Sequence, residues 1–173
     1  MTDNKQALER AMTLAALSGF KIALGPAFLE TARRRPSARN WVMGALGEMV
    51  LDKLGIFPPR YRPSLLVPHT LAGAWVARES LKEDGIDDVS AVAAAAAVAA
   101  GVAISAPLIR MAGGRILGIP DVLLAVAEDY LALYLGTRAL GLSMGQVADE
   151  AREAVGEVRG RIRPALESVG VNV

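Results

Sequence analysis

Residues 41–57 read WVMGALGEMVLDKLGIF, an apolar stretch that carries Glu48, Asp52 and Lys53 in its second half. Its apolar residues recur at helical spacing, and strand signals are almost absent here and in the other apolar runs of the chain, which are rich in Ala, Leu and Met. We therefore predict an all-α protein. A charge inside hydrocarbon costs roughly 3 kcal/mol even on lenient scales, so ionisable residues in a membrane-like segment indicate a functional site.

A second stretch of this kind follows later in the chain. Residues 122–136, VLLAVAEDYLALYLG, carry Glu128 and Asp129. The chain can be aligned with itself at the offset that places Pro26 on Pro107. At this offset four further positions match in residue type: Arg34 with Arg115, Glu48 with Asp129, Leu54 with Leu135, and Gly55 with Gly136. Many transporters are built from such doubled units. We therefore predict two repeat halves, 1–84 and 85–173, packed as one compact domain.

Six helical elements are expected from the apolar runs and the Pro- and Gly-rich joints between them: 11–31, 40–57, 64–80, 89–111, 116–141 and 145–165. Three elements in each half would give the halves inverted orientations in a membrane. Residues 89–109 are uncharged throughout, and the run is long enough to cross about 30 Å of hydrocarbon. The other apolar runs are shorter or interrupted, so we expect broken or re-entrant helices in a polytopic membrane fold.

The pattern changes at about residue 143, where the chain becomes polar and amphipathic. Val147, Ala151, Val155 and Val158 fall at helical spacing, with charged residues on the other faces. This C-terminal helix is too polar to cross a membrane. We expect it to lie on the surface or in solvent.

The composition narrows the class of protein. The chain has 173 residues, 53% of them apolar, and a net charge of +1, which gives no indication of nucleic acid as a partner. It has no cysteine and one histidine, so we expect no metal site and no cofactor. The N-terminus MTDNKQALERAM lacks the features of a cleaved signal peptide. No nucleophile–base pair is evident, so an enzyme is the least favoured class of protein. The one enzyme class that stays open is a membrane-embedded hydrolase that uses two acids.

The candidate transport or binding site consists of six ionisable residues in the apolar runs: Lys21, Glu48, Asp52, Lys53, Glu128 and Asp129. Glu48 and Asp52 are four positions apart and share one face of a helix. Lys21 lies midway along the first run and is expected to face a carboxylate. Asp129 matches Glu48 in the alignment of the two halves, and Glu128 matches it when that alignment is moved by one position, which leaves the choice between them open. The alternative is a buried salt-bridge network that only locks helices together.

Two pairs of residues predict breaks in the leading helices of the two halves. Gly25 and Pro26 interrupt the first run, and Pro107 stands at the matched place in the fourth, after Ala106. A break frees backbone groups that coordinate ions or headgroups, whereas a simple kink would have no such role. Arg34, Arg115 and Arg110 are candidates for lipid headgroup contacts. His69 has no partner in the sequence, and a capping or headgroup-facing role is favoured for it over a role as ligand.

The run GALGEMVLDKL, after LSGFKIALGPAF, resembles a widespread family of small bacterial multi-pass membrane proteins whose activity is not established. The shared motif is Glu-x-x-x-Asp-Lys, here Glu48, Asp52 and Lys53. A Gly-rich opening helix with Gly19 and Gly25 and a small-residue helix over 91–101 also match, and the resemblance covers roughly residues 12–140. It implies an integral protein of the bacterial inner membrane. The polar tail after Ser143 departs from the family pattern.

The function expected from the sequence is that of a small membrane transporter or channel for an ion, a small solute or a lipid headgroup. The partners are the lipid bilayer and that ligand, together with a second copy of the chain, because five short segments barely enclose a polar site. One alternative is a scaffold membrane protein whose buried charges only fix helix packing. The other is a soluble helical binding module, which the modest hydropathy supports.

Overall fold

The computed structural model describes residues 2–54 and 60–168, and these residues form helices without any strand. The all-α prediction is therefore confirmed for the described residues. The helices are α1 (Thr2–Phe20), α2 (Leu24–Ala32), α3 (Ala38–Lys53), α4 (Pro63–Glu83), α5 (Val89–Leu117), α6 (Asp121–Leu140) and α7 (Met144–Ser168). Gly55 and the end of the element predicted at 40–57 lie outside the described residues.

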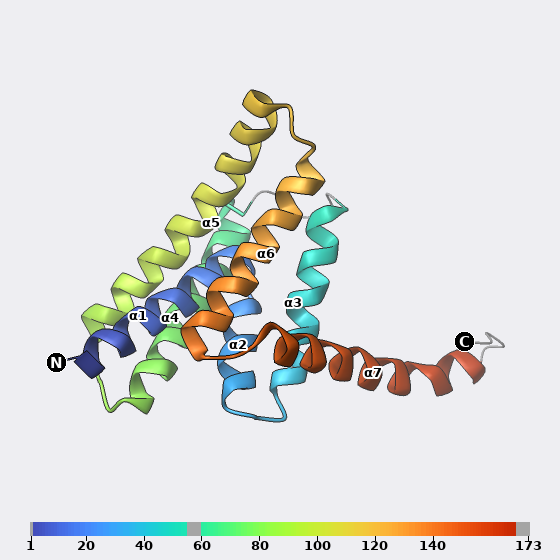
Figure 1. The fold of residues 1–173 in the computed structure, drawn as a ribbon, viewed down its shortest axis with the longest axis horizontal. Helices are drawn as coiled ribbons and strands as arrows, with labels where there is room; N and C mark the ends of the chain where they lie inside the picture. Colours follow the sequence, from blue (N-terminus) through green and yellow to red (C-terminus); the bar gives the residue numbers. More distant parts are fainter. Residues whose placement is uncertain (1, 55–59, 169–173) are drawn as a thin grey trace.

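The first predicted element, 11–31, is two helices in the structure. Helix α1 runs into the middle of the bundle and α2 runs back out, so that the pair forms a hairpin (Figure 1). Ion pairs join this hairpin to the end of α4. Arg10, midway along α1, pairs with Asp84 just after α4, and Arg33, just after α2, pairs with Glu83. The closed end of the hairpin lies inside the protein, since Lys21 in the turn is buried.

Helices α1, α4 and α5 pack closely because small residues line their contacts. The buried residues of α5 are mostly alanines at every fourth position, Ala91, Ala95, Ala99 and Ala103. A Cβ atom added to Gly73 of α4 would overlap the side chain of Ala99. A second part of the core is built from larger side chains of α1 and α2, with Leu14, Leu17, Leu24, Phe28 and Leu29 all buried.

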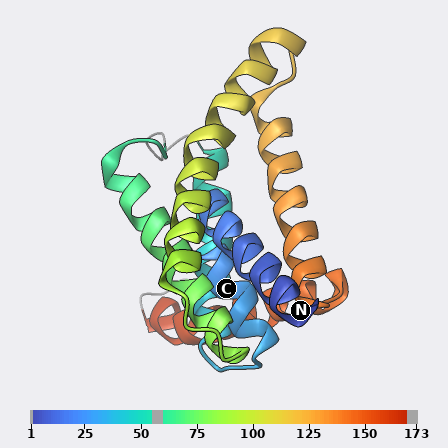
Figure 2. The same ribbon diagram turned by 90° about the vertical axis from the view of Figure 1, so that its left-hand side faces the viewer.

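Helices α5 and α6 form a long hairpin whose closed end extends beyond the other helices (Figure 2). Helix α5 is the one helix within residues 2–54 and 60–168 that is long and apolar enough to cross a membrane. Only 22% of its most apolar 18-residue stretch is buried in the protein. The remainder is open to the surroundings.

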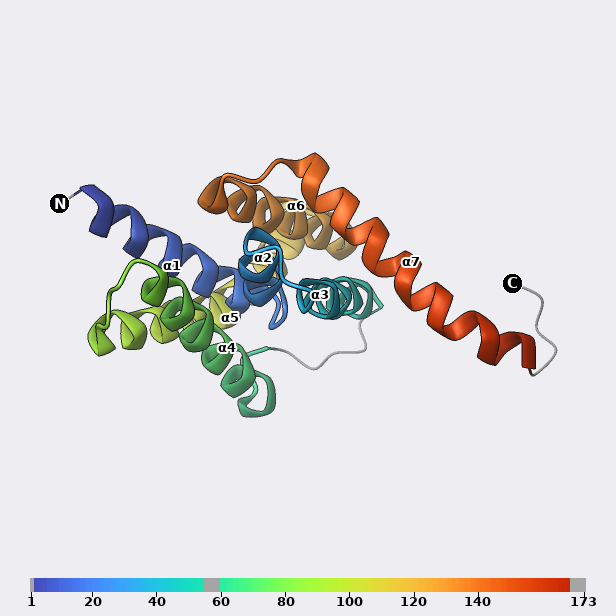
Figure 3. The ribbon, with the colours of Figure 1, turned by 90° about the horizontal axis from the view of Figure 1, so that it is seen from below.

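Helix α7 extends away from the bundle (Figure 3), and it contacts the bundle at α3 and α6. Ala154 is buried, while Val147, Ala151 and Val158 are partly buried on the inner face. Arg39 of α3 holds this part of α7 through ion pairs to Glu153 and Glu157. The expected amphipathic helix is present, although Val155 is exposed instead of lying on the packed face.

Candidate functional site

The site begins at the break between α1 and α2. Residues 21–23 leave the helical path shortly before Pro26. A proline ring clashes with the carbonyl of the fourth residue before it, which here is Ile22, so Pro26 ends the preceding helix and is accommodated in the first turn of the next. Gly25 serves close packing, because a Cβ atom there would overlap Ser18 Oγ and the carbonyl of Leu14.

The second predicted break is absent. Helix α5 runs from Val89 to Leu117 through Pro107 without interruption. The prediction of a break at Pro107 is therefore wrong, and the leading helices of the two predicted halves differ. Proline removes one backbone hydrogen bond from a helix, and α5 continues across Pro107 despite this loss.

Glu48 closes the broken end of α2. Its carboxylate accepts hydrogen bonds from the backbone N–H groups of Ile22, at 2.7 Å, and Ala23, at 2.8 Å. The first N–H groups of a helix have no partner within it, and the helix dipole places positive charge there. Glu48, in the second half of α3, thus supplies both the acceptors and the negative charge that the start of α2 needs.

His69 closes the end of α1 in a complementary way. Its Nδ1 lies 2.5 Å from the carbonyl oxygen of Ser18, in the last turn of α1. A carbonyl only accepts hydrogen bonds, so Nδ1 carries the proton and donates it. This contact agrees with the capping role that the sequence favours for His69. The side chain is buried and lies on the wall of a pocket.

Lys21, in the turn between the two helices, is the centre of a buried group of charges. Its Nζ lies 3.3 Å from Asp52, 3.4 Å from Glu128 and 3.2 Å from Asp129. The side chain is 3% exposed, so these carboxylates replace water as its surroundings. The expectation that Lys21 faces a carboxylate is confirmed, and both acids of the second half take part.

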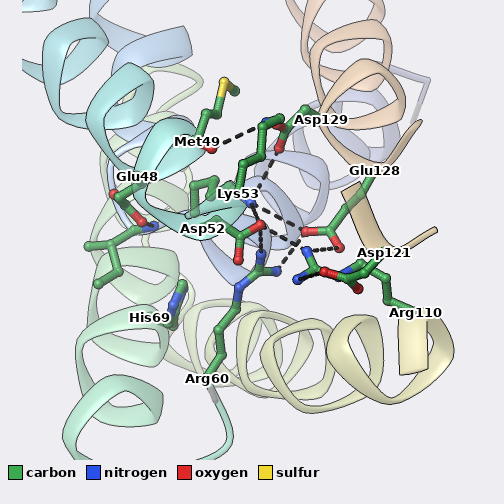
Figure 4. A network of polar contacts seen from close by, with 12 residues as sticks. Glu48, Met49, Asp52, Lys53, Arg60, His69, Arg110, Asp121, Glu128 and Asp129 are labelled. Atoms are coloured by element: carbon green, nitrogen blue, oxygen red, sulfur yellow. Dashed lines mark hydrogen bonds and ion pairs between the residues drawn. The ribbon is translucent and has the colours of Figure 1, made fainter. Parts of the chain in front are cut away.

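Seven residues make up this group, which we name the charged cluster: Lys21, Asp52, Lys53, Arg60, Arg110, Glu128 and Asp129 (Figure 4). Asp52 Oδ2 is shared by three cations, with Lys21 and Arg60 at 3.3 Å and Arg110 at 2.8 Å. Arg60 also donates to Glu128 at 2.7 Å. Lys53 pairs with Asp129.

The structure therefore gathers five of the six predicted site residues in one cluster and assigns Glu48 to the adjacent helix end. Arg110, predicted as a headgroup contact, belongs to the cluster. Arg34 and Arg115 do not, because both are exposed and the ion pairs found among the described residues do not involve them. Arg34 lies in the turn after α2 with a φ of 53°.

Sequence reasoning missed Arg60. It lies in the connector between α3 and α4, in a charged and Pro-rich joint that is typical of a solvent-exposed loop. Its role is visible in the structure, where it is 8% exposed and pairs with Asp52 and Glu128. Burial of a connector residue has no signature in the local sequence.

A pocket of about 340 Å³ opens beside the charged cluster. Its charged lining consists of Lys21, Lys53, Arg60, Arg110, Glu48 and Asp52. Apolar and aromatic side chains, together with His69 and Asp121, complete the wall: Ile22, Tyr61, Leu65, Pro107, Leu108 and Met111. The described residues contain no group of three His or carboxylate side chains suited to hold a metal ion. The pocket is instead equipped to hold a small charged molecule by ion pairs.

Comparisons with known proteins do not identify the chain, since no family model, no curated protein and no solved structure matches it.

Proposed function

We propose that this chain is a multi-pass membrane protein that binds a small charged ligand at the charged cluster and moves it across the membrane. An ion, a small solute and a lipid headgroup are the classes of ligand that fit. The observation that carries the proposal is the position of the cluster, at the meeting point of two half-helices and beside an open pocket. The resemblance to bacterial inner-membrane proteins points to that membrane as the location.

The outer surface supports insertion in lipid. Large apolar side chains are exposed on four helices, among them Val50 of α3 with Leu54 just after it, Val67 and Leu71 of α4, Ile104 and Ile109 of α5, and Leu123, Val126 and Leu131 of α6. Soluble monomers rarely expose apolar patches larger than a few hundred Å². Three of these helices direct charged residues inward to the cluster instead: Asp52 and Lys53 of α3, Arg110 of α5, and Glu128 and Asp129 of α6. Ionisable residues in membrane segments are expected to be arranged in this way.

The hairpin of α1 and α2 supports a transport site in particular. Its closed end and the charged cluster lie inside the bundle, where Lys21 is buried, while the end of α2 is tied to the end of α4 by the ion pair of Arg33 with Glu83. In a membrane this is a re-entrant element. Discontinuous helices with their ends directed at a central site are common in transporters, because the ends supply charge and free backbone groups. Irregular backbone at that depth is tolerated where a cavity or protein covers it.

Helix positions support the proposed repeat. Helices α4 and α7 begin at Pro63 and Met144, which are as far apart in the sequence as Pro26 and Pro107. The separation between the first residues of α3 and α6 differs from this offset by two positions. Glu48 and Asp129, which match at this offset, both lie next to the Lys21 turn. The proposed halves diverge in their last element, because α4 packs on α1 and α5 whereas α7 packs on α3 and α6.

The first experiment is fractionation of expressing cells with an alkaline carbonate wash. We expect the chain to stay in the washed membranes, and release into the soluble fraction would overturn the membrane proposal. The second is an osmotic swelling assay on proteoliposomes with a panel of small potassium and chloride salts. We expect at least one solute to enter faster than in empty liposomes, and Asp52→Asn to abolish the difference. Equal rates for the protein and empty liposomes would exclude transport.

A scaffold function is the second candidate, and one observation favours it. Every member of the charged cluster has an oppositely charged partner, and no buried side-chain N or O atom among the described residues lacks a hydrogen bond. A fully paired network of this kind is suited to fixing helices in place. In that case Asp52→Asn would lower thermal stability, and the swelling assay would show no solute entry for the wild type.

A further inference from the structure

Arg110 makes two kinds of contact, and they differ in exposure. On its inner side, Nη1 donates to Asp52 at 2.8 Å. On its outer side, Nε donates to Asp121 Oδ1 at 2.8 Å and Nη2 donates to Oδ2 at 3.3 Å. The outer pair uses both carboxylate oxygens side by side, which is the geometry in which a guanidinium recognises a carboxylate or a phosphate. The Asp52 side chain is 14% exposed, whereas that of Asp121 is 67% exposed.

We propose that Asp121 occupies the place of a ligand phosphate, and that a small molecule or headgroup bearing a phosphate binds Arg110 by displacing this carboxylate. The inference rests on the proposed function of the pocket as a binding site, and it names the chemical class of the ligand. Asp121 acts as an internal competitor, which keeps the guanidinium paired until the ligand arrives.

The exchange changes little in the rest of the site. Asp121 is the first residue of α6, so its released carboxylate would turn into water next to the positive end of the helix dipole. Arg110 would stay in position because Asp52 still holds its inner side. Exposed ion pairs such as that of Asp121 contribute little, since water and salt screen them.

Four cations on the wall of the pocket favour a phosphate over a single carboxylate as the displacing group. Lys21, Lys53, Arg60 and Arg110 all line the pocket, and a phosphate offers three free oxygens to such a group of donors. The part of the wall formed by His69 and Glu48 can accept a hydrogen bond from a donor group on the same ligand. His69 Nδ1 gives its proton to Ser18, so in the neutral ring Nε2 is an acceptor, and Glu48 also lies on the wall.

The test is titration of the purified full chain, in neutral detergent at constant ionic strength, with inorganic phosphate against sodium chloride as the control. We expect saturable binding, which Asp121→Asn tightens about two- to fivefold because a weak competitor is removed. Arg110→Lys keeps the charge but loses the planar fork, and we expect it to weaken binding about tenfold or more. Arg115→Gln, an exposed arginine on the same helix, is the matched control and should leave binding unchanged.

The double variant Arg110→Lys with Asp121→Asn separates displacement from a general change in surface charge. If Asp121 acts through Arg110, its substitution will have no effect once the fork is gone. An equal gain in both backgrounds would overturn the proposal. So would a loss in Arg115→Gln as large as that in Arg110→Lys.

Nanodiscs of phosphatidylglycerol or phosphatidylcholine distinguish the source of the phosphate. Saturable binding of inorganic phosphate indicates a soluble ligand. A rise in thermal stability in phosphatidylglycerol alone, lost in Arg110→Lys, indicates a headgroup. If neither probe gives an effect that depends on Arg110, the phosphate proposal is wrong even when carbonate-washed membranes retain the chain, so its failure is distinct from that of the membrane proposal.

Discussion

Replacing Glu48 with glutamine tests whether this residue holds the broken helix together. The two carboxylate oxygens accept from Ile22 and Ala23 at 2.7 and 2.8 Å. Glutamine has one acceptor oxygen, so one N–H group would lose its partner and face an NH₂ group instead. The negative charge next to the start of α2 would be lost as well.

The cost follows from these two losses. A hydrogen bond to a charged group contributes about 1.5–3 kcal/mol, and a charge at a helix end about 0.3–1 kcal/mol, so we expect Glu48→Gln to lower the free energy of unfolding by roughly 2–4 kcal/mol. For a chain of this length that corresponds to a fall in Tm of roughly 5–15 °C. Glu48→Ala leaves both N–H groups without the carboxylate and should be less stable still.

Thermal unfolding of the purified protein in detergent, followed by circular dichroism, measures the change. Amide hydrogen exchange adds a local readout, because the amides of Ile22 and Ala23 should lose protection in Glu48→Gln. The matched control is Asp149→Asn, an exposed acid of α7 that pairs with its neighbour Arg152 on the same helix. A Tm for Glu48→Gln within about 2 °C of that of the control, with both amides still protected, would refute the reasoning.

Three further predictions concern the cluster, the helix packing and a helix cap. Lys21→Gln leaves three buried carboxylates short of a cation and should cost roughly 3–5 kcal/mol, a loss that thermal unfolding will detect and that Lys5→Gln, at an exposed position of α1, should not reproduce. Gly136→Ala places a Cβ atom 2.5 Å from the Phe28 ring and should cost about 1–3 kcal/mol in the same assay, where an unchanged Tm would contradict the packing. The hydrogen bond from Ser90 Oγ, with two backbone N–H groups, holds the pKa of Asp88 below its usual value. The ionised cap therefore stabilises the fold above about pH 4 and loses this effect as the pH falls through the lowered pKa. Asp88→Asn should thus show less acid destabilisation than the wild type in a pH series of Tm, and parallel curves would contradict this.

Much of the candidate site was accessible from the sequence because its signal is local. A carboxylate or a lysine in an apolar run is conspicuous wherever the fold places it, and Lys21, Asp52, Lys53 and Asp129 were identified on that ground. The particular partner of each side chain could not be predicted from the sequence. Nothing local says that Glu48 would bind the backbone N–H groups of a distant turn rather than join the cluster beside Asp52.

The sequence leaves open whether Glu128 or Asp129 belongs to the site. Adjacent residues on a helix point about 100° apart, so a single helix face would admit only one of them. In the structure both reach the cluster, because cations approach α6 from two sides. Arg60 and Arg110 contact Glu128, and Lys53 contacts Asp129.

The sequence by itself determined that the chain is helical, where most helices begin and end, and which apolar runs carry charge. These properties depend on spacing, on prolines and glycines, and on residue type, all of which act over a few neighbouring positions. The tertiary structure alone decided which carboxylates surround Lys21, that α5 passes through Pro107, and that the connector residue Arg60 is buried. Each of these depends on the energy of contacts between segments distant in the chain, such as the carboxylate of α3 that closes the start of α2. Contacts of that kind have no counterpart in the local pattern of residues.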